Sequence, residues 1–220
     1  MPNLFPRWTN RLPIKVVTAA VVLGALVSAA VAYFFTPKYT QVGYQPDQPV
    51  PFQHDLHVKQ LGMDCRYCHS NVEVSAASNI PTAQTCMNCH SQIQKNNPKL
   101  AQLRKAWETG EPLPWVKIHY VPDYAYFNHS VHVNRGVSCV SCHGNVDKME
   151  VVYKDQPQSM GWCLDCHRDP AKHVRPTEEV FNLDWKPSGD NPVKAQRELG
   201  SQLVKQWKIH PPENCSGCHR

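Results

Sequence analysis

The longest apolar stretch of the chain lies near its N-terminus. Residues 16–35, VVTAAVVLGALVSAAVAYFF, contain twenty positions and no charge, which is the length and composition of a membrane-spanning helix. The remaining sequence mixes short apolar groups with polar ones and holds most of the 19 prolines. Such a pattern predicts loops and short helices in place of long regular elements.

Charges around this apolar stretch indicate its orientation. Arg7, Arg11 and Lys15 precede it, and the first 35 residues contain no acidic side chain. The positive-inside rule therefore predicts a cytoplasmic segment, a membrane anchor and a domain on the outer face, at residues 1–15, 16–35 and 36–220. A cleaved signal peptide is the alternative, because residues 30–32 resemble a cleavage site. The length of the apolar run favours a retained anchor.

Two later stretches carry the sequence signals of a helix start. Asn97-Pro98 and Asn191-Pro192 each place an N-cap residue directly before a proline, which suits the first helical position. Gly110 is expected to end the first of these helices, because glycine readily adopts the left-handed conformation. The apolar residues predicted to share one face of that helix are Leu100, Leu103 and Trp107.

All ten cysteines occur in five C-x-x-C pairs, and a histidine follows each pair directly. C-x-x-C-H is the attachment signature of haem c: two thiols add to the two vinyl groups of one porphyrin, and the adjacent imidazole binds the iron. We number the motifs in chain order and expect five covalently bound haems c. Their residues are Cys65, Cys68 and His69; Cys86, Cys89 and His90; Cys139, Cys142 and His143; Cys163, Cys166 and His167; and Cys215, Cys218 and His219.

Structural zinc, redox dithiols and disulfides are weaker interpretations of the same cysteines. A zinc site usually combines two C-x-x-C pairs and does not need a histidine directly after each one. Histidine makes up 12 of the 220 residues, so five such placements by chance have a probability on the order of 5 × 10⁻⁷. Disulfides within the pairs would close very short loops, which gain least from cross-linking.

The formal net charge of +5 does not predict nucleic-acid binding. Three of these positive charges precede the apolar stretch, and five haems would add about ten propionate carboxylates to the outer domain. We therefore expect an acidic outer domain, and no nucleic-acid partner follows from the basic composition of the polypeptide.

An internal duplication groups the motifs. Phe52 begins FQHDLHVKQLGMDCRYCH and Phe127 begins FNHSVHVNRGVSCVSCH, so F-x-H-x-x-H-V recurs with glycine three residues before the first cysteine. A further C-x-x-C-H motif follows each copy. We expect a first module near 52–90, a second module near 127–167 and a final haem at 215–219. The predicted fold is that of a multihaem cytochrome c, mostly loops and short α-helices wrapped around five haems, with one N-terminal transmembrane helix.

An iron bound by one histidine has a sixth position, which electron carriers fill with His or Met. The H-x-x-H pairs are the best suppliers, because residues three apart lie on one face of a helix. His119 is a further candidate, His210 and Met160 are weaker ones, and His173 and Met87 are the least favoured. The sequence does not assign distal ligands to individual irons. The distal candidates from the H-x-x-H pairs are His54, His57, His129 and His132.

These features together resemble the pentahaem cytochrome c subunit of bacterial alternative complex III, a quinol oxidoreductase. The resemblance rests on the N-terminal span, the five motifs, the paired F-x-H-x-x-H segments and the stretches WVKIHYVPDYAYFNH and SMGWCLDCH. It covers nearly the whole chain. The F-x-H-x-x-H element followed by C-x-x-C-H is less specific, since it also recurs in cytochromes c7 and c3.

The resemblance implies partners, a location and a role. The partners are an iron–sulfur large subunit related to molybdopterin oxidoreductases, a monohaem cytochrome c subunit and integral membrane subunits that oxidise menaquinol. The location is the bacterial inner membrane, with the haem domain on the periplasmic face. The role is that of an electron carrier between quinol and a cytochrome, another soluble acceptor or a terminal oxidase, so that the chain alone is not an enzyme.

Two other functions are alternatives. A membrane-anchored multihaem quinol dehydrogenase feeding a periplasmic reductase would also carry one span and four or five haems. The 29 residues between Phe35 and Cys65 are a longer spacing than we expect for that class. A catalytic multihaem enzyme would need an open iron, often with an unusual attachment motif, and the sequence contains no C-x-x-C-K.

Overall fold

The computed structural model describes residues 6–219, and the chain divides into two compact units between Gln41 and Val42. Pro13 occupies the first turn of the long N-terminal helix, where its missing N–H donor is not required. The helices of the N-terminal unit are η1 (Arg7–Arg11), α1 (Leu12–Phe34) and α2 (Pro37–Thr40).

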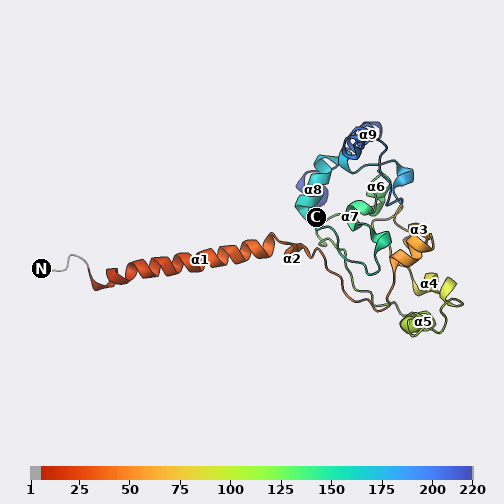
Figure 1. Cartoon of the computed structure of the whole chain (residues 1–220), viewed down its shortest axis with the longest axis horizontal. Helices are drawn as coiled ribbons and strands as arrows, with labels where there is room; N and C mark the ends of the chain where they lie inside the picture. Colours follow the sequence, from red (N-terminus) through yellow and green to blue (C-terminus); the bar gives the residue numbers. More distant parts are fainter. Residues whose placement is uncertain (1–5, 220) are drawn as a thin grey trace. The chain divides into compact units, whose positions relative to one another are not determined.

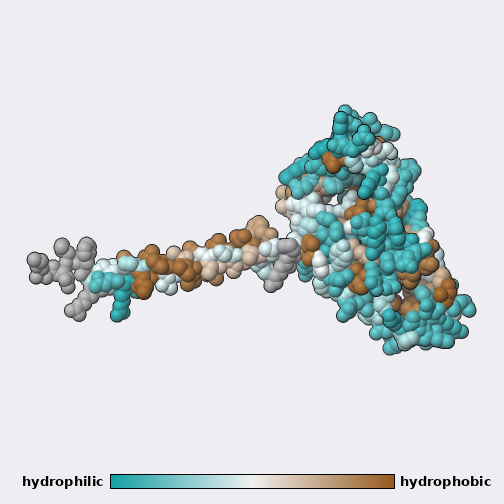
Figure 2. Space-filling view, in the orientation of Figure 1, coloured by the Kyte–Doolittle hydropathy of each residue, from teal (hydrophilic) through white to brown (hydrophobic). Residues whose placement is uncertain are grey.

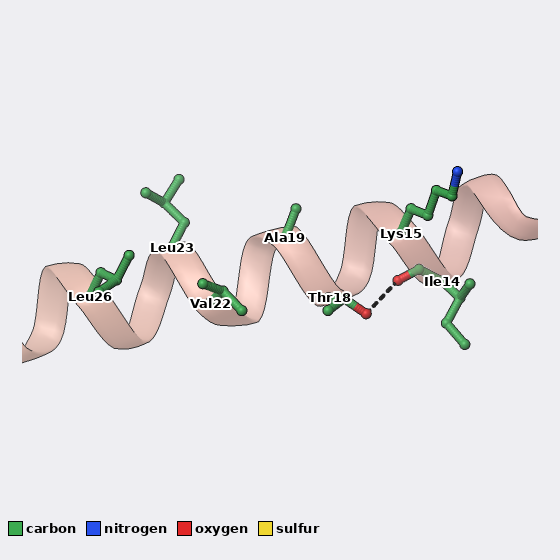
Figure 3. A pocket seen from close by; sticks show the side chains of 7 residues that line it. All are labelled: Ile14, Lys15, Thr18, Ala19, Val22, Leu23 and Leu26. Carbon is green, nitrogen blue, oxygen red and sulfur yellow. Dashed lines mark hydrogen bonds between the residues drawn. The ribbon is translucent and has the colours of Figure 1, made fainter.

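Helix α1 exposes apolar side chains along its length, and none of its residues is buried. Trp8–Phe34 is long and apolar enough to cross a membrane, judged by length and composition. Figure 2 shows hydrophobic residues along this helix. In Figure 3, Thr18 Oγ1 donates to the carbonyl oxygen of Ile14 at 2.8 Å. The hydroxyl is thus satisfied within the helix, as a lipid environment requires.

The second unit consists of short helices joined by long loops (Figure 1). Residues 6–219 contain no β-strand, and isolated bridges pair Ala125 with His219 and Val137 with Val174. The expected fold of loops and short helices is confirmed. The helices are η2 (Asp55–Gln60, π-helical), α3 (Cys65–Cys68), α4 (Ala83–His90), η3 (Pro98–Leu100), α5 (Ala101–Thr109), α6 (His129–Val133), α7 (Val140–His143), η4 (Val146–Lys148), α8 (Met160–Arg168), η5 (Pro170–Lys172), η6 (Thr177–Glu179), α9 (Pro192–Gln206) and α10 (Cys215–Cys218).

Polar caps begin several of these short helices. Asp64 accepts a hydrogen bond from the backbone N–H of Arg66 at the start of α3, and Asn214 accepts one from Gly217 at the start of α10. Ser159 accepts one from Trp162 at the start of α8. Such caps satisfy backbone donors that have no partner within the helix. They set where the first, fourth and fifth attachment motifs become helical.

The two connecting helices begin where the sequence predicts. Asn97 caps η3 and α5 follows it, Asn191 caps α9, and Gly110 ends α5 with a left-handed φ of +75°. The predicted face of α5 is only partly correct. Leu103 is buried and Leu100 packs against the same cluster, but Ala106 is buried in place of Trp107. Trp107 is 46% exposed and its indole N–H donates to Gln84, because a large ring with one polar edge needs a partner for that edge.

The polypeptide alone forms little hydrophobic core. Leu61, Val74 and Ile80 are 64%, 78% and 58% exposed, although each is large and apolar. A domain of this size normally buries most such side chains. That bound porphyrins supply much of the interior stays a prediction. The two small clusters of buried residues are Val50, Met87 and Leu103, and Val72, Val133 and Val180.

Candidate haem-binding sites

Each attachment motif lies on a short helix in the second unit. Helices α3, α4, α7, α8 and α10 carry the first to the fifth motif in order. Helical spacing places two cysteines three residues apart on one side of the backbone. None of the ten cysteines forms a disulfide, and no group of three or more His, Cys, Asp or Glu side chains in the described residues is arranged to hold a metal ion. This arrangement does not resemble a zinc site built from two C-x-x-C pairs.

The thiols of the third motif have raised pKa values. Burial raises the pKa of Cys139 to about 11 and that of Cys142 to about 12. Reactive dithiols need a lowered pKa, which an electropositive, partly exposed setting provides. The other resolved pKa shifts of motif cysteines are also upward, with desolvation as the largest cause. Attachment of a prosthetic group fits these cysteines better than disulfide exchange.

Several motif histidines have one ring nitrogen fixed by the backbone. His69 Nδ1 lies 2.8 Å from the carbonyl oxygen of Asn79, and His167 Nδ1 lies 2.7 Å from that of Pro212. His90 Nδ1 lies 3.0 Å from the carbonyl oxygen of its neighbour Ile93. A carbonyl only accepts, so Nδ1 carries the proton and Nε2 keeps its lone pair. This is the usual outer-shell arrangement of a metal-binding histidine.

The H-x-x-H histidines repeat this arrangement. His57 Nδ1 lies 2.8 Å from the carbonyl oxygen of Gln53, and His132 Nδ1 lies 2.7 Å from that of Asn128. His129 Nδ1 lies 2.8 Å from the carbonyl oxygen of Ala76, which belongs to the first module. Each of these three imidazoles therefore also presents an unprotonated Nε2.

The phenylalanine of each repeat orients both histidines. The Phe52 ring stacks on His57 with 4.4 Å between centroids and meets His54 edge-on at 4.8 Å. Phe127 stacks on His132 at 4.9 Å and meets His129 edge-on at 4.7 Å. Aromatic contacts of this kind limit the rotation of the imidazole rings. The F-x-H-x-x-H repeat is thus a structural repeat as well as a sequence repeat.

Three pairs of imidazoles are separated by a nearly constant distance. The ring centroids of His57 and His90 and those of His132 and His167 are both 6.2 Å apart, and those of His129 and His143 are 6.5 Å apart. Two imidazoles on opposite sides of one metal ion place their centroids roughly 6 Å apart, since each metal–nitrogen bond is about 2 Å. The spacing therefore fits one iron between each pair.

The histidines around the third motif are kept neutral. Desolvation lowers the pKa of His143 to about 3 and the pKa values of His54 and His119 to about 4. Neutral imidazole is the form that binds a metal. His54 Nδ1 and His119 Nε2 are buried without a hydrogen-bond partner, which is unfavourable unless a ligand completes them. These side chains therefore fit axial ligands of haem c.

The other candidates, His119 among them, do not form such pairs. His119 lies 4.4 Å from His143 between centroids, too close for an iron between them. His210 is exposed, and Met160 is 65% exposed. His173 is half-buried, and desolvation lowers its pKa. His219 contacts Tyr124 at 5.7 Å between centroids.

Met87 is buried within the first hydrophobic cluster, and sequence reasoning placed it among the least favoured ligands. Other supporting residues were missed. The carbonyl groups of Ala76 and Pro212 have no sequence signature, because every residue has a carbonyl. Asn79 does have a sequence signature. Its φ of +59° lies in the left-handed region, which asparagine tolerates better than most residues.

The first three motifs are linked in space in an order that differs from the chain. The second motif touches the first, because Asn88 donates to the hydroxyl of Tyr67 at 3.1 Å and both lie between motif cysteines. The first module touches the third motif through His129, which bonds Ala76 and faces His143.

The last three motifs continue the same line of contacts. Gln158, just before α8, donates to the carbonyl oxygen of Cys142 at 3.5 Å and so links the third motif to the fourth. The fourth motif touches the segment before the fifth through His167 and Pro212, and Arg168 pairs with Glu213 at 3.8 Å. The exposed motif cysteines, Cys89 and Cys215, belong to the second and fifth motifs, which lie at the two ends of this line.

Two family models match different parts of the chain. The model for cytochrome c7 and related cytochrome c matches residues 125–220, and the model for the class III cytochrome C family matches residues 34–119. Each match contains one copy of the duplicated module. Both models describe cytochromes c, so each of these two parts of the chain is similar to a cytochrome c family.

Two curated proteins are similar to this chain. The menaquinone reductase multihaem cytochrome c subunit of Nitratidesulfovibrio vulgaris Hildenborough is 29% identical over 179 residues, which are 80% of this chain and 69% of that protein. The acrylate reductase cytochrome subunit of Shewanella woodyi is 23% identical over 115 residues, which are 52% of this chain and 72% of that protein. Both relatives are cytochrome subunits of reductases, as their names state.

Proposed function

We propose that this chain is the electron-transfer subunit of a quinone-linked membrane complex and carries five covalently bound haems c. When bound, each haem supplies a one-electron Fe(III)/Fe(II) couple. The polypeptide attaches, spaces and orients these groups and keeps solvent from them. The proposal rests mainly on the recurrence of one imidazole arrangement in both modules.

Four pairs of axial ligands follow from this arrangement. His57 with His90 and His132 with His167 hold the second haem of each module, because their centroids are 6.2 Å apart and their Nδ1 atoms are tied to carbonyls. His129 with His143 holds the first haem of the second module. By the duplication, His54 with His69 holds the equivalent haem of the first module. The fifth iron takes its distal ligand from the remaining candidates, which are His119, His210 and Met160.

The contacts between motifs support a spatial order of second, first, third, fourth and fifth. Electron transfer between neighbours requires that the redox centres lie close together. The third motif lies in the middle of this order, and the second and fifth lie at its ends. The two ends, with their exposed cysteines, are where exchange with partners takes place.

The specific complex we propose is alternative complex III. Its iron–sulfur and molybdopterin-like large subunit, its monohaem cytochrome c subunit and its quinol-binding membrane subunits would be the partners. Residues 16–35 would anchor the chain in the bacterial inner membrane, with the N-terminus cytoplasmic and the haem domain on the periplasmic face. The apolar, exposed surface of α1 supports the anchor.

A second candidate is a membrane-anchored quinol dehydrogenase that feeds a periplasmic reductase. The similarity to an acrylate reductase cytochrome subunit is the observation that favours it. The two candidates differ in what accompanies the chain. An integral quinol-binding subunit with an iron–sulfur large subunit indicates the first, and a soluble reductase alone indicates the second.

One preparation tests these proposals. The chain is purified in mild detergent, its partners are identified by mass spectrometry, and its haem content is measured by the pyridine haemochrome assay. We expect five haems per chain, all low-spin by EPR, and no turnover by the isolated subunit. Fewer than five haems would contradict the proposed haem content. Ready binding of carbon monoxide to most ferrous centres would contradict the proposed axial ligands.

A further inference from the structure

Lys154 is a buried cation that has no carboxylate partner among residues 6–219. Its side chain and backbone together are 5% exposed. Its ammonium lies over the ring of Tyr120, 5.2 Å from the centroid. Within residues 6–219, no carboxylate lies within ion-pair distance of its Nζ. The other lysines whose burial the structure describes are less buried.

The contact with Tyr120 does not offset the free-energy cost of burying the Lys154 ammonium. Removing an ammonium group from water is strongly unfavourable, and only an opposite charge with good geometry offsets the penalty. A cation–π contact with one tyrosine is a weaker interaction than that penalty. Desolvation accordingly lowers the pKa of Lys154. An anion that is not part of the polypeptide would complete the site.

The backbone fixes Lys154 beside the third motif. Its N–H donates to the carbonyl oxygen of Tyr44 at 3.0 Å, and its carbonyl accepts from Gly43 at 2.7 Å. The next residue, Asp155, packs against Gly144 so closely that a Cβ on that glycine would lie 2.6 Å from the Asp155 carboxyl carbon. Gly144 directly follows His143, the proximal iron ligand proposed for this motif.

Asp155 is not the missing partner of Lys154. Its carboxylate accepts a hydrogen bond from Gln156 at 2.7 Å and packs on the glycine, and it does not lie within 4 Å of the ammonium. The ring of His119 lies near both Lys154 and the third motif, because its centroid is 4.4 Å from that of His143 and Lys154 contributes to lowering its pKa. Lys154 therefore lies near the region where the third haem is expected.

We propose that Lys154 forms an ion pair with a propionate of the haem attached at Cys139 and Cys142. Each haem c carries two propionates, which are carboxylates of the required charge. The inference rests on the proposed haem at the third motif. The ion pair would also raise the midpoint potential of this haem. A positive charge near the iron favours the reduced state, and pairing with Lys154 weakens the opposite effect of the propionate charge.

The test is a redox titration of the isolated five-haem subunit. Lys154→Met removes the charge and keeps the length of the side chain. One of the five midpoint potentials should fall, by on the order of a tenfold change in the equilibrium constant for reduction, which is 59 mV for a one-electron couple. Lys154→Arg should leave all five potentials close to those of the wild type. Five unchanged potentials in Lys154→Met would overturn the inference.

Lys117 provides the matched control. It lies over the same Tyr120 ring, 6.0 Å from the centroid, but it is exposed. Lys117→Met should leave every midpoint potential unchanged, because solvent screens an exposed charge. If Lys117→Met and Lys154→Met change the midpoint potentials equally, the inference is wrong. The change would then come from the loss of a cation over the Tyr120 ring.

Two further readouts separate the possible causes of failure. The haemochrome assay reports whether five haems are present, so loss of the proposed function is seen independently of Lys154. If Lys154→Met does not accumulate, the resonance Raman propionate-bending bands of Lys154→Arg are compared with those of the wild type. One band should shift, and an unchanged set of bands would contradict the inference. A potential shift seen only in the assembled complex would identify a partner carboxylate or a lipid phosphate as the counter-ion and would also contradict it.

Discussion

The two modules use equivalent histidines in different surroundings. In each module the second histidine of H-x-x-H faces the histidine of the module's own second motif, at 6.2 Å in both cases. The first histidine instead lies where the modules meet. His129 bonds Ala76 of the first module, and the backbone N–H of His54 donates to Met149 of the second.

These reciprocal contacts between the modules explain the spatial order of the motifs. The carbonyl that each first histidine contacts lies a few residues after the first motif of the opposite module. The first and third motifs are therefore brought together at the junction, while the second and fourth lie on either side. Duplication of a unit with two C-x-x-C-H motifs thus produces a continuous line of candidate sites, and the fifth motif is added next to the fourth. The modules differ at this histidine: His129 Nδ1 is bonded across the junction, whereas His54 Nδ1 has no partner.

Among the tests of this spatial order, removal of a single attachment site should have the largest effect on electron transfer. Cys65→Ser with Cys68→Ser removes the first motif and should isolate the second motif's haem from the other three. Cys86→Ser with Cys89→Ser removes a terminal motif and should leave the remaining four connected. Stopped-flow reduction of the purified complex by a quinol measures how many haems are reduced rapidly.

The two double variants should give different patterns. Without the first motif, either three haems or only one should be reduced rapidly, depending on the end at which electrons enter. Without the second motif, either all four remaining haems or none of them should be reduced rapidly. A haemochrome value of four in both variants is the control. If the two patterns were exchanged, the motifs would follow one another in chain order and our spatial order would be wrong.

Alanine at the two equivalent glycines should affect stability unequally. Gly62 and Gly136 have φ values of +69° and +78°, so either substitution costs about 1–2 kcal/mol in the left-handed conformation. A Cβ at Gly62 meets nothing within 4 Å, whereas one at Gly136 would lie 2.2 Å from the carbonyl oxygen of Arg175. Gly136→Ala should therefore lower the free energy of unfolding by roughly 3 kcal/mol or more. Denaturant unfolding of both variants checks this, and equal losses would show that the second module is not more tightly packed there.

His129→Ala and His54→Ala should give similar spectra but different stabilities. Each should keep its haems covalently attached and convert one low-spin iron to high spin, as measured by EPR. His129→Ala also removes the hydrogen bond to Ala76, which contributes about 1 kcal/mol. It should therefore be less stable than His54→Ala by about that amount. An unchanged low-spin count in His129→Ala would exclude this residue as a ligand.

Sequence reasoning predicted those features that local residues determine. The five motifs, the duplicated F-x-H-x-x-H segments and the helix ends at Asn97, Gly110 and Asn191 depend on side chains close in sequence, and the helix ends are confirmed. The exposure of Trp107 and the burial of Lys154 depend on residues distant in sequence. The contacts of imidazoles with backbone carbonyls also depend on tertiary structure, because a carbonyl carries no residue-specific signal.

An exposed ionic contact between the modules should have the smallest effect. Asp184 bonds Lys148 of the second module and Lys59 of the first, and these two lysines lower its pKa to about 2. The folded carboxylate thus has a lower pKa than the unfolded one, so its stabilisation is present above about pH 4 and disappears as the pH falls towards 2. Asp184→Asn should therefore lower the thermal midpoint at pH 6 by a small amount that decreases with added salt, since exposed pairs are screened. The difference from wild type should shrink between pH 4 and pH 2, and Asp190→Asn, at an exposed site, should show no such pH dependence. A difference that persists at pH 2 would mean that Asp184 supports the junction by packing and not by charge.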